Sequence, residues 1–304
     1  MKIFVTGATG FIGSAVTQEL LGAGHQVLGL ARSDGSARWL QAAGAEVHRG
    51  DLEDVPGLRR GAAASDAVIH TAFIHDFSQF AKNSAVDKRA IEALGEALAG
   101  SERPLLVTAG LPLSVQGPGN ARLATEADEA GAVSETFPRA SEHAAAALEA
   151  RGVRATVVRL PQVHDTAKQG LVSYAIQVAR AKGVSAYVGE GRNRWAAVHR
   201  FDAARLYRLA LEGGTPGARY HAIAEEGVTS REIAEAIARG LGVPAVSVTP
   251  AEAVAHFGWL AAFMGLDLAA SSERTRKALG WNPTGPGLIA DLDRMQYAEP
   301  TLTA

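Results

Sequence analysis

Short apolar runs alternate with amphipathic stretches through the first half of the chain. The runs have the length of buried strands, and the stretches between them repeat apolar residues at helical spacing. The expected strands cover residues 3–5, 25–30, 45–48, 67–70, 104–108 and 154–159, and the expected helices cover 12–23, 36–43, 54–64, 77–99 and 139–150. This alternation predicts an α/β fold, a doubly wound parallel sheet of Rossmann type with helices on both faces.

The pattern loosens after Pro161, where we expect a smaller C-terminal lobe for the substrate. Residues 1–165 are expected to form the sheet domain, residues 196–224 to return to it, and residues 166–304 to form most of the lobe. Ala251–Ala270 carries several large apolar side chains and predicts one apolar helix that packs over the lobe.

Three glycines follow the first expected strand at every third position, and a helix follows them. Glycine allows a sharp turn and a close approach of phosphate to the backbone, and a helix N-terminus offers free N–H groups to an anion. The alternative is a purely structural turn, but the strand–turn–helix context favours a diphosphate site. The residues expected to form it are Gly7, Thr9, Gly10, Phe11, Ile12 and Gly13.

The composition limits the classes of partner and of chemistry that we expect. A net charge of −2 gives no reason to expect a nucleic acid, and no apolar run reaches the ~18 residues of a membrane span. The chain has no cysteine, which excludes disulfides and thiolate catalysis. The N-terminus does not resemble a signal peptide. We therefore expect a cytoplasmic protein, a monomer or homodimer, that acts on a small molecule.

The residues after the second expected strand indicate which nucleotide is bound. In this fold an acidic residue there holds the ribose 2′-hydroxyl of NAD, but the position falls near Ala31, and Asp34 comes too late. Arg32 and Ser33 offer a guanidinium and a hydroxyl, which suit a 2′-phosphate. The alternative for Arg32 is a solvated loop residue. The pattern favours NADP(H) over NAD(H).

The run TGATGFIG resembles the TGxxGxxG fingerprint of the extended short-chain dehydrogenases/reductases, which include sugar-nucleotide epimerases and dehydratases. WAAVHRFD at 195–202 and SSERTRKALGWNP at 271–283 resemble later segments of that family. The resemblance implies adenine contacts from Asp51 and Leu52, ribose contacts from Thr71, Ala72 and Phe73, and further cofactor contacts from Thr108 and Pro161.

The catalytic pair of that family is not found. Its tyrosine, which exchanges the proton with the carbonyl oxygen, aligns with Pro138, and its lysine aligns with Glu142. Residues 104–160 contain no tyrosine, so a small shift of the alignment does not restore the pair. Thr108 and Ser114 are the hydroxyls nearest to the position of the assisting serine or threonine, and neither fits well.

Two histidines can replace the missing proton donor, because imidazole titrates near neutral pH. His75 follows the fourth expected strand, where the adjacent Asp76 can orient it, and His164 follows the sixth. The alternative for each is a histidine that only satisfies a loop hydrogen bond. No histidine spacing matches a metal site, so we expect no metal.

These patterns predict an NADP(H)-dependent oxidoreductase of atypical extended short-chain type. Trp195, Trp259 and Phe263 indicate a small aromatic or apolar substrate, although Arg192 and Arg194 resemble the diphosphate-binding arginines of sugar-nucleotide enzymes. An isomerase or dehydratase with bound cofactor is the alternative among enzymes. A catalytically silent NADPH-binding sensor is the alternative outside them.

Overall fold

The computed structural model describes residues 1–112 and 122–297. Its central element is a seven-stranded sheet in the order β10-β6-β5-β4-β1-β2-β3, and each neighbouring pair is parallel. The strands are β1 Lys2–Thr6, β2 Gln26–Ala31, β3 Glu46–Arg49, β4 Ala67–His70, β5 Leu105–Gly110, β6 Ala155–Leu160 and β10 Arg219–His221. The predicted fold class, a doubly wound parallel sheet, is confirmed.

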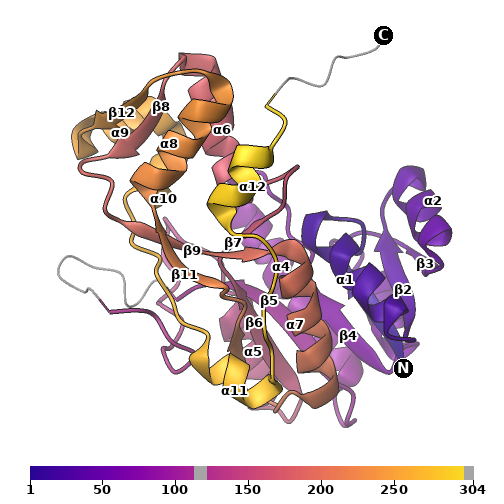
Figure 1. The fold of residues 1–304 in the computed structure, drawn as a ribbon. Coiled ribbons are helices and arrows are strands. Elements are labelled where there is room, and N and C mark those ends of the chain that lie inside the picture. Colours follow the sequence, from indigo (N-terminus) through magenta and orange to yellow (C-terminus); the bar gives the residue numbers. More distant parts are fainter. Residues whose placement is uncertain (113–121, 298–304) are drawn as a thin grey trace.

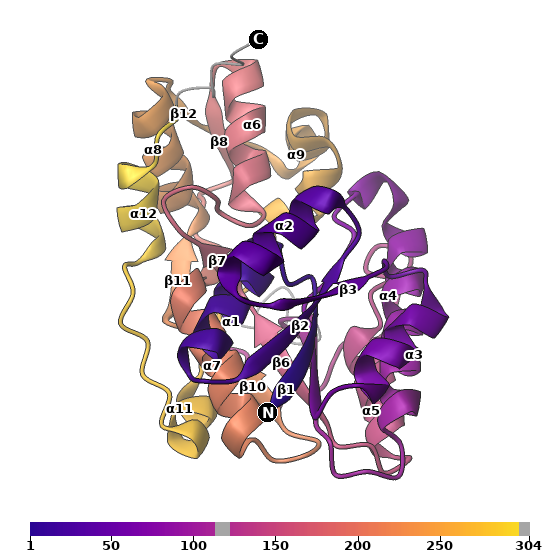
Figure 2. The same ribbon diagram turned by 90° about the vertical axis from the view of Figure 1, so that its right-hand side faces the viewer.

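Helices cover both faces of this sheet (Figures 1 and 2). One layer holds α1 Phe11–Gly22, α2 Asp34–Ala43 and α7 Arg200–Gly213, and the other holds α3 Val55–Ala63, α4 Phe80–Leu98 and α5 Ser141–Glu149. Successive strand residues point to opposite faces. In β1, Ile3 and Val5 lie in the core with α1 and α7, whereas Phe4 lies in the core with α3 and α4.

The smaller lobe contains two further sheets. One has the order β11-β9-β7 and the other pairs β12 with β8. The strands are β7 Gln162–His164, β8 Ser185–Val188, β9 Arg194–His199, β11 Glu225–Thr229 and β12 Ala245–Val248. The helices after β6, apart from α7, are α6 Val172–Lys182, α8 Ser230–Leu241, α9 Pro250–Phe257, α10 Ala261–Met264, α11 Glu273–Leu279 and α12 Leu288–Arg294. All of these helices except α11 contribute to a core around Trp195 and Phe257.

The prediction of one helix over Ala251–Ala270 is wrong. Gly258 adopts φ +59°, a left-handed conformation that ends α9, and a 3₁₀ turn then leads into the short α10. Past Gly265 the chain runs beside β9, where Leu268 forms a bridge with Trp195. The glycines therefore divide an apolar segment that helical spacing alone would have kept continuous.

The long stretch 111–134 was expected to be irregular. Residues 113–121, which include Ser114, lie outside the described residues. The part after them has no regular helix or strand, but Ala124 bridges Ala270 and the Glu126 side chain accepts hydrogen bonds from Thr275. None of the helices in the described residues combines the length and apolar composition needed to cross a membrane.

Candidate functional site

The glycine turn lies at the point where the strand order of the sheet reverses. β1 pairs with β2 on one side and β4 on the other, and open α/β sheets bind ligands outside the carboxyl ends of such strands. Gly7 adopts φ +70°, and a Cβ there would lie 2.8 Å from the amide nitrogen of Ala72. A Cβ on Gly13 would lie 2.0 Å from the carbonyl oxygen of Gly7. Both positions therefore require glycine.

The N-terminus of α1 keeps its backbone donors free of side chains. Its N-cap is Gly10, and no described side chain caps it, whereas other helices are capped by Ser33, Asp54, Thr229 and Thr249. The Phe11 ring beside this end lies under two cations, with Lys168 Nζ at 5.7 Å and Arg200 Cζ at 5.4 Å from its centroid. Free N–H groups and nearby positive charge are what a bound diphosphate needs.

Hydroxyl groups connect the glycine turn to the start of α2. Ser33 caps α2 by accepting from the Ser36 amide at 3.2 Å, and Ser36 Oγ also accepts from Thr9 at 3.2 Å. Arg32 is exposed next to them and has no partner among the described residues. Asp34 pairs instead with Arg49 at 2.7 Å. Sequence reasoning missed Ser36, although its spacing from Ser33 is that of a capping pair.

The remaining expected cofactor contacts lie at or near the carboxyl ends of β3, β4, β5 and β6, along the edge of the sheet that carries the glycine turn, which we call the crevice. Asp51 Oδ1 accepts from the amides of Glu53 and Asp54, and the exposed carboxylate keeps its second oxygen unbonded in the described part of the chain. Leu52 packs against the core beside α3 and α4. Thr71 Oγ1 donates to the Thr6 carbonyl at 2.8 Å, which holds this segment against the glycine turn.

Two expected contacts are less available than the resemblance implied. The Thr108 side chain is buried, and its hydroxyl donates to the His70 carbonyl at 2.7 Å and lies 2.6 Å from the Tyr207 hydroxyl. It thus points into the interior and leaves only its backbone at the crevice. Burial raises the pKa of Tyr207, which keeps this phenol neutral. Pro161 is half-buried between β6 and β7.

The segment before and at the start of α5 holds Pro138 and Glu142, where the catalytic pair was expected. Glu142 turns inward and accepts from Arg159 Nη2 at 2.6 Å and Arg159 Nε at 2.8 Å. Arg219 Nε donates to the same carboxylate at 2.6 Å. Glu142 is thus the centre of a buried ion cluster and does not reach the crevice.

Arg139, which precedes α5, lies at the crevice instead. Its Cζ lies 4.4 Å from the centroid of the Phe73 ring, and Nη2 donates to the Thr108 carbonyl at 3.0 Å. Nε donates to Ser141 Oγ at 2.8 Å. Sequence reasoning missed Arg139. The available signal was a lone cation between Pro138 and Ser141, at the helix start where a cationic residue was expected.

A chain of buried polar groups lies behind Arg139. Ser141 Oγ donates to Asp87 Oδ2 at 2.5 Å, and Asp87 Oδ1 lies 3.1 Å from His70 Nε2. The Nδ1 atom of His70 lies 2.8 Å from Thr6 Oγ1, at the base of the glycine turn. The charge of Arg139 is the main attraction that keeps the pKa of Asp87 lowered despite its burial, so the carboxylate stays ionised.

His75 lies at the exposed edge of the crevice, but Asp76 does not orient it. Asp76 caps the 3₁₀ turn Phe77–Gln79 by accepting from Ser78 and Gln79, which corrects the expected pairing. Loss of water around the imidazole lowers the pKa of His75, and the charges of Arg139 and Lys168 lower it further.

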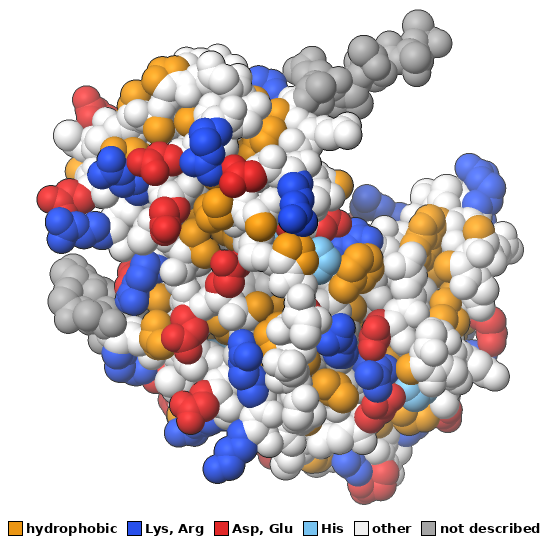
Figure 3. Space-filling view, in the orientation of Figure 1, with side chains coloured by type: hydrophobic (Ala, Val, Ile, Leu, Met, Phe, Trp, Pro, Cys, Tyr) orange, Lys and Arg blue, Asp and Glu red, His pale blue; other side chains and the backbone are white. Residues whose placement is uncertain are grey.

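Aromatic side chains from both parts of the molecule meet beside His75. The Phe77 and Trp259 rings stack at 4.5 Å with an interplanar angle of 12°, which joins the loop after β4 to the lobe. We call this set the aromatic rim, and its members are Phe73, His75, Phe77, Phe80, Phe137, Tyr174, Trp259 and Phe263. Figure 3 shows the surface hollowed between the lobe and the side of the sheet that carries α2.

The expected role of His164 in proton transfer is not supported by its position. The side chain is fully buried, and Nδ1 lies 2.7 Å from Asp291 Oδ2 on α12. The strand β7 directs this residue into the packing between β9 and α12. Burial lowers its pKa although Asp291 and Glu225 oppose the shift. We interpret His164 as a structural residue.

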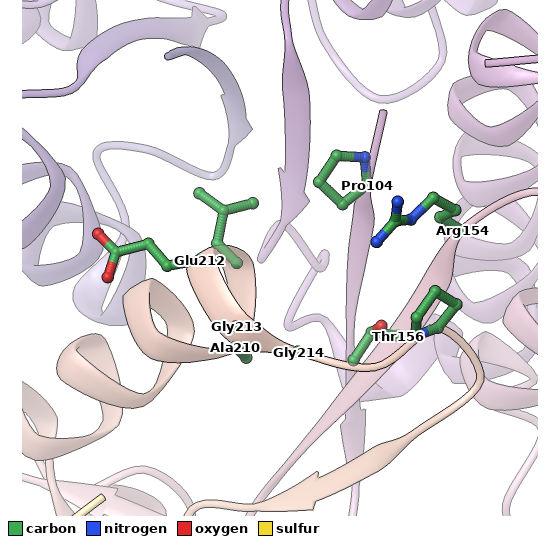
Figure 4. A pocket seen from close by; sticks show the side chains of 9 residues that line it. Pro104, Arg154, Thr156, Ala210, Glu212, Gly213 and Gly214 are labelled. Atoms are coloured by element: carbon green, nitrogen blue, oxygen red, sulfur yellow. The ribbon is translucent and has the colours of Figure 1, made fainter. Parts of the chain in front are cut away.

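A separate hollow of about 260 Å³ lies at the opposite end of the sheet. Its lining comes from the starts of β5 and β6 and the end of α7, including Pro104, Arg154 and Gly213 (Figure 4). The amino ends of parallel strands are not where such sheets bind their ligands. This hollow therefore does not belong to the candidate site.

Comparisons with known proteins agree with this geometry. The family described as NAD(P)H-binding matches residues 7–186. An uncharacterized protein of Schizosaccharomyces pombe is 47% identical over 98% of this chain and 100% of its own length. The 2-alkyl-3-oxoalkanoate reductase of Stenotrophomonas maltophilia is 28% identical over 81% of this chain and 77% of its own. The dTDP-glucose 4,6-dehydratase of Streptomyces venezuelae, solved with NAD and TYD bound, has a TM-score of 0.75 at 20% identity and covers 97% of this chain and 96% of that chain.

Proposed function

This chain belongs to the NAD(P)H-binding family, and from that premise we propose that it is an NADP(H)-dependent oxidoreductase that reduces a small aromatic or apolar molecule. The observation that carries the proposal is the uncapped glycine turn at the reversal point of the sheet, where Arg32 has no partner in the described part of the chain and Asp34 pairs with Arg49. The similarity to a 2-alkyl-3-oxoalkanoate reductase supports a reductase.

The residues present fit a dinucleotide. Bound NADPH supplies a hydride, which is the chemistry of the cofactor itself. The backbone N–H groups after Gly10 would hold the diphosphate, Arg32 and Ser33 would hold the 2′-phosphate, and Thr71 to Phe73 would contact the ribose. The aromatic rim contributes apolar surface for the substrate and excludes water from it.

We assign His75 the role of proton donor at the edge of the crevice. A general acid must be protonated, and the pKa of His75 is lowered below its usual value of about 6.5. Activity that depends on this proton therefore rises as the pH falls below neutrality. The chain has no tyrosine between residues 104 and 160, so an imidazole at this edge takes over part of the work of the family's phenol.

The test is to incubate the protein with NADPH and a panel of ketones, imines and quinones, and to follow the loss of NADPH absorbance. We expect turnover with at least one aromatic acceptor and tighter binding of NADPH than of NADH. Gly10→Val tests the cofactor site itself, because a side chain at this N-cap enters the space that the phosphate needs. If calorimetry shows that Gly10→Val binds NADPH as tightly as the parent, the proposed cofactor site is wrong.

A further inference from the structure

We propose that Arg139 is a further catalytic residue, whose guanidinium binds the carbonyl oxygen of the substrate and stabilises the negative charge that develops on it. This inference rests on the proposed reductase function and names the residue that receives the oxygen. It also narrows the substrate class to molecules that carry a carbonyl oxygen at one end of an aromatic or apolar body.

The position of Arg139 places it in the crevice. Its Nη2 donates to the carbonyl of Thr108 on β5, and its guanidinium stacks on Phe73, which follows β4. The amide of Ala72, adjacent to Phe73, lies against Gly7 of the glycine turn. The cation is thus at the carboxyl ends of two central strands, beside the turn that holds the diphosphate.

The side chain is held rigidly. Ser141 Oγ accepts a hydrogen bond from Nε and donates one to Asp87 Oδ2, whose side chain is about 1% exposed. The Nε atom lies 3.8 Å from Asp87 Oδ2. A donor that is already oriented costs little reorganisation when charge develops next to it, and such preorganised donors contribute strongly to catalysis.

Arg139 also keeps donors available. Two of its nitrogens are used by Ser141 and Thr108, but Nη1 has no hydrogen-bond partner among the described residues. The side chain is 26% exposed, so a small molecule can reach it.

The surroundings indicate the body of the ligand. The Phe73 ring that supports Arg139 contacts the His75 ring at 5.4 Å, and His75 continues through Phe77 to Trp259 in the aromatic rim. One fixed cation and an adjacent row of rings match a molecule with an oxygen at one end and an apolar or aromatic remainder.

The reaction step balances without a tyrosine. The carbonyl carbon would accept the hydride that NADPH supplies, leaving NADP⁺, while the π electron pair of the C=O bond moves to the oxygen and the resulting alkoxide pairs with the guanidinium. A proton from His75 or from water then completes the alcohol. Arg139 keeps its own proton throughout, because guanidinium does not deprotonate in proteins. Its role is electrostatic, and the proton comes from a different group.

The test uses 2-naphthoate as a mimic of the anionic oxygen and 2-naphthamide as its neutral control, both titrated by calorimetry into NADPH-saturated protein. We expect Arg139→Gln to weaken naphthoate binding at least tenfold and to change naphthamide binding less than about twofold. Arg139→Lys should give an intermediate loss, because lysine keeps the charge but not the fork. Arg89→Gln, at an exposed arginine on α4, should change neither.

Four results would overturn the inference: no naphthoate binding by the parent, equal naphthoate binding by parent and Arg139→Gln, equal loss of both ligands, or a matching loss of NADPH affinity. If Arg139→Gln does not fold, Arg139→Lys decides by the same comparison. The proposed function fails separately. Naphthoate binding that depends on Arg139, without NADPH oxidation by any acceptor, would preserve the oxygen site and reject the reductase.

Discussion

Two charged networks start from one short segment, residues 139–142, and they differ in how completely their donors are used. We call the first the sealed network, formed by Glu142, Arg159 and His221. Arg159 is fully buried and donates from all its nitrogens, to Glu142, to the carbonyls of Thr125 and Asp128, and to His221. The open network, formed by Arg139, Ser141, Asp87 and His70, ends at Arg139 in the crevice.

The difference shows how one helix start serves packing and chemistry together. Successive helical residues point about 100° apart, so Ser141 reaches Asp87 whereas Glu142 reaches Arg159. In the sealed network the Arg159 cation is fully buried and each of its nitrogens has a protein partner, so this cation keeps no donor for a ligand. In the open network Arg139 keeps Nη1 without a hydrogen-bond partner among the described residues, so this donor can bind a ligand. Mutations in the two networks and in their surroundings can test this contrast.

Breaking the sealed network should have the largest effect. Glu142→Gln leaves the Arg159 cation buried without its counter-charge, and removing one partner of such a pair costs about 3–5 kcal/mol of unfolding free energy. Urea denaturation measures the loss. Glu102→Gln, which removes a surface pair with Arg154, should cost less than about 1 kcal/mol. Similar losses of unfolding free energy for both variants would contradict the claim that the buried pair matters more than the surface pair.

The second largest effect should come from low pH, which should lower the unfolding free energy through His221 of the sealed network. His221 Nδ1 lies 2.8 Å from the Ser271 carbonyl and Nε2 faces Arg159, so the ring is held neutral. Burial, with the Arg159 charge, lowers the pKa of His221 to about 4, against attraction from Glu126 and Glu142. In the unfolded chain the value is about 6.5, so the unfolded state binds more protons between these limits.

Stability is therefore complete above pH 6.5 and falls toward pH 4, by up to about 1.4 kcal/mol per pH unit for this group. Denaturant titrations at pH 7, 6 and 5 measure the slope. His164, whose pKa is also lowered, adds to it, so the informative quantity is the difference between the parent and His221→Asn. The variant should have the flatter slope. His143→Asn, at an exposed position, is the control, and equal slopes for parent and His221→Asn would reject the mechanism.

Arg32 extends the comparison to an exposed cation that has no partner among the described residues. Arg32→Ala should weaken NADPH binding roughly tenfold or more, about 1.5–3 kcal/mol, because a charge-assisted contact to phosphate is lost. NADH binding, measured by the same calorimetry, should stay within about twofold. Arg89→Ala serves as the control. An equal loss for both cofactors would show that Arg32 does not select the phosphate.

The smallest effect should come from the aromatic rim beside the open network. A double-mutant cycle with Phe77→Ala and Trp259→Ala should give a coupling free energy of about 0.5–1.5 kcal/mol in urea denaturation, the usual range for an aromatic pair. Phe201→Ala combined with Trp259→Ala is the matched control, because the described ring contacts join Phe201 to neither Phe77 nor Trp259. A coupling of zero for the stacked pair would mean that the rim does not join the two parts of the molecule.

The sheet and the glycine turn were predictable because local rules determine them. Apolar spacing identified the strands and helices of the first half, and the Gly7–Gly13 spacing needed only its strand–turn–helix context. The partners of single side chains were not predictable in this way. His164 bonds to Asp291, which is 127 positions away, and Arg139 depends on Phe73, which precedes it by a whole strand and helix. Asp76 next to His75 shows the converse, because adjacency in sequence did not produce a contact.

The late return of β10 to the edge of the sheet has a consequence for synthesis on the ribosome. β6 is complete at Leu160, but its outer neighbour begins at Arg219, after much of the lobe has been made. At ribosomal speeds of about 5–20 residues per second, roughly 60 residues take about 3–12 s. During that interval the nascent chain exposes the hydrogen-bonding edge of an apolar strand, which other chains can pair with. Slower elongation across residues 161–218 lengthens this interval and should therefore lower the yield of folded protein.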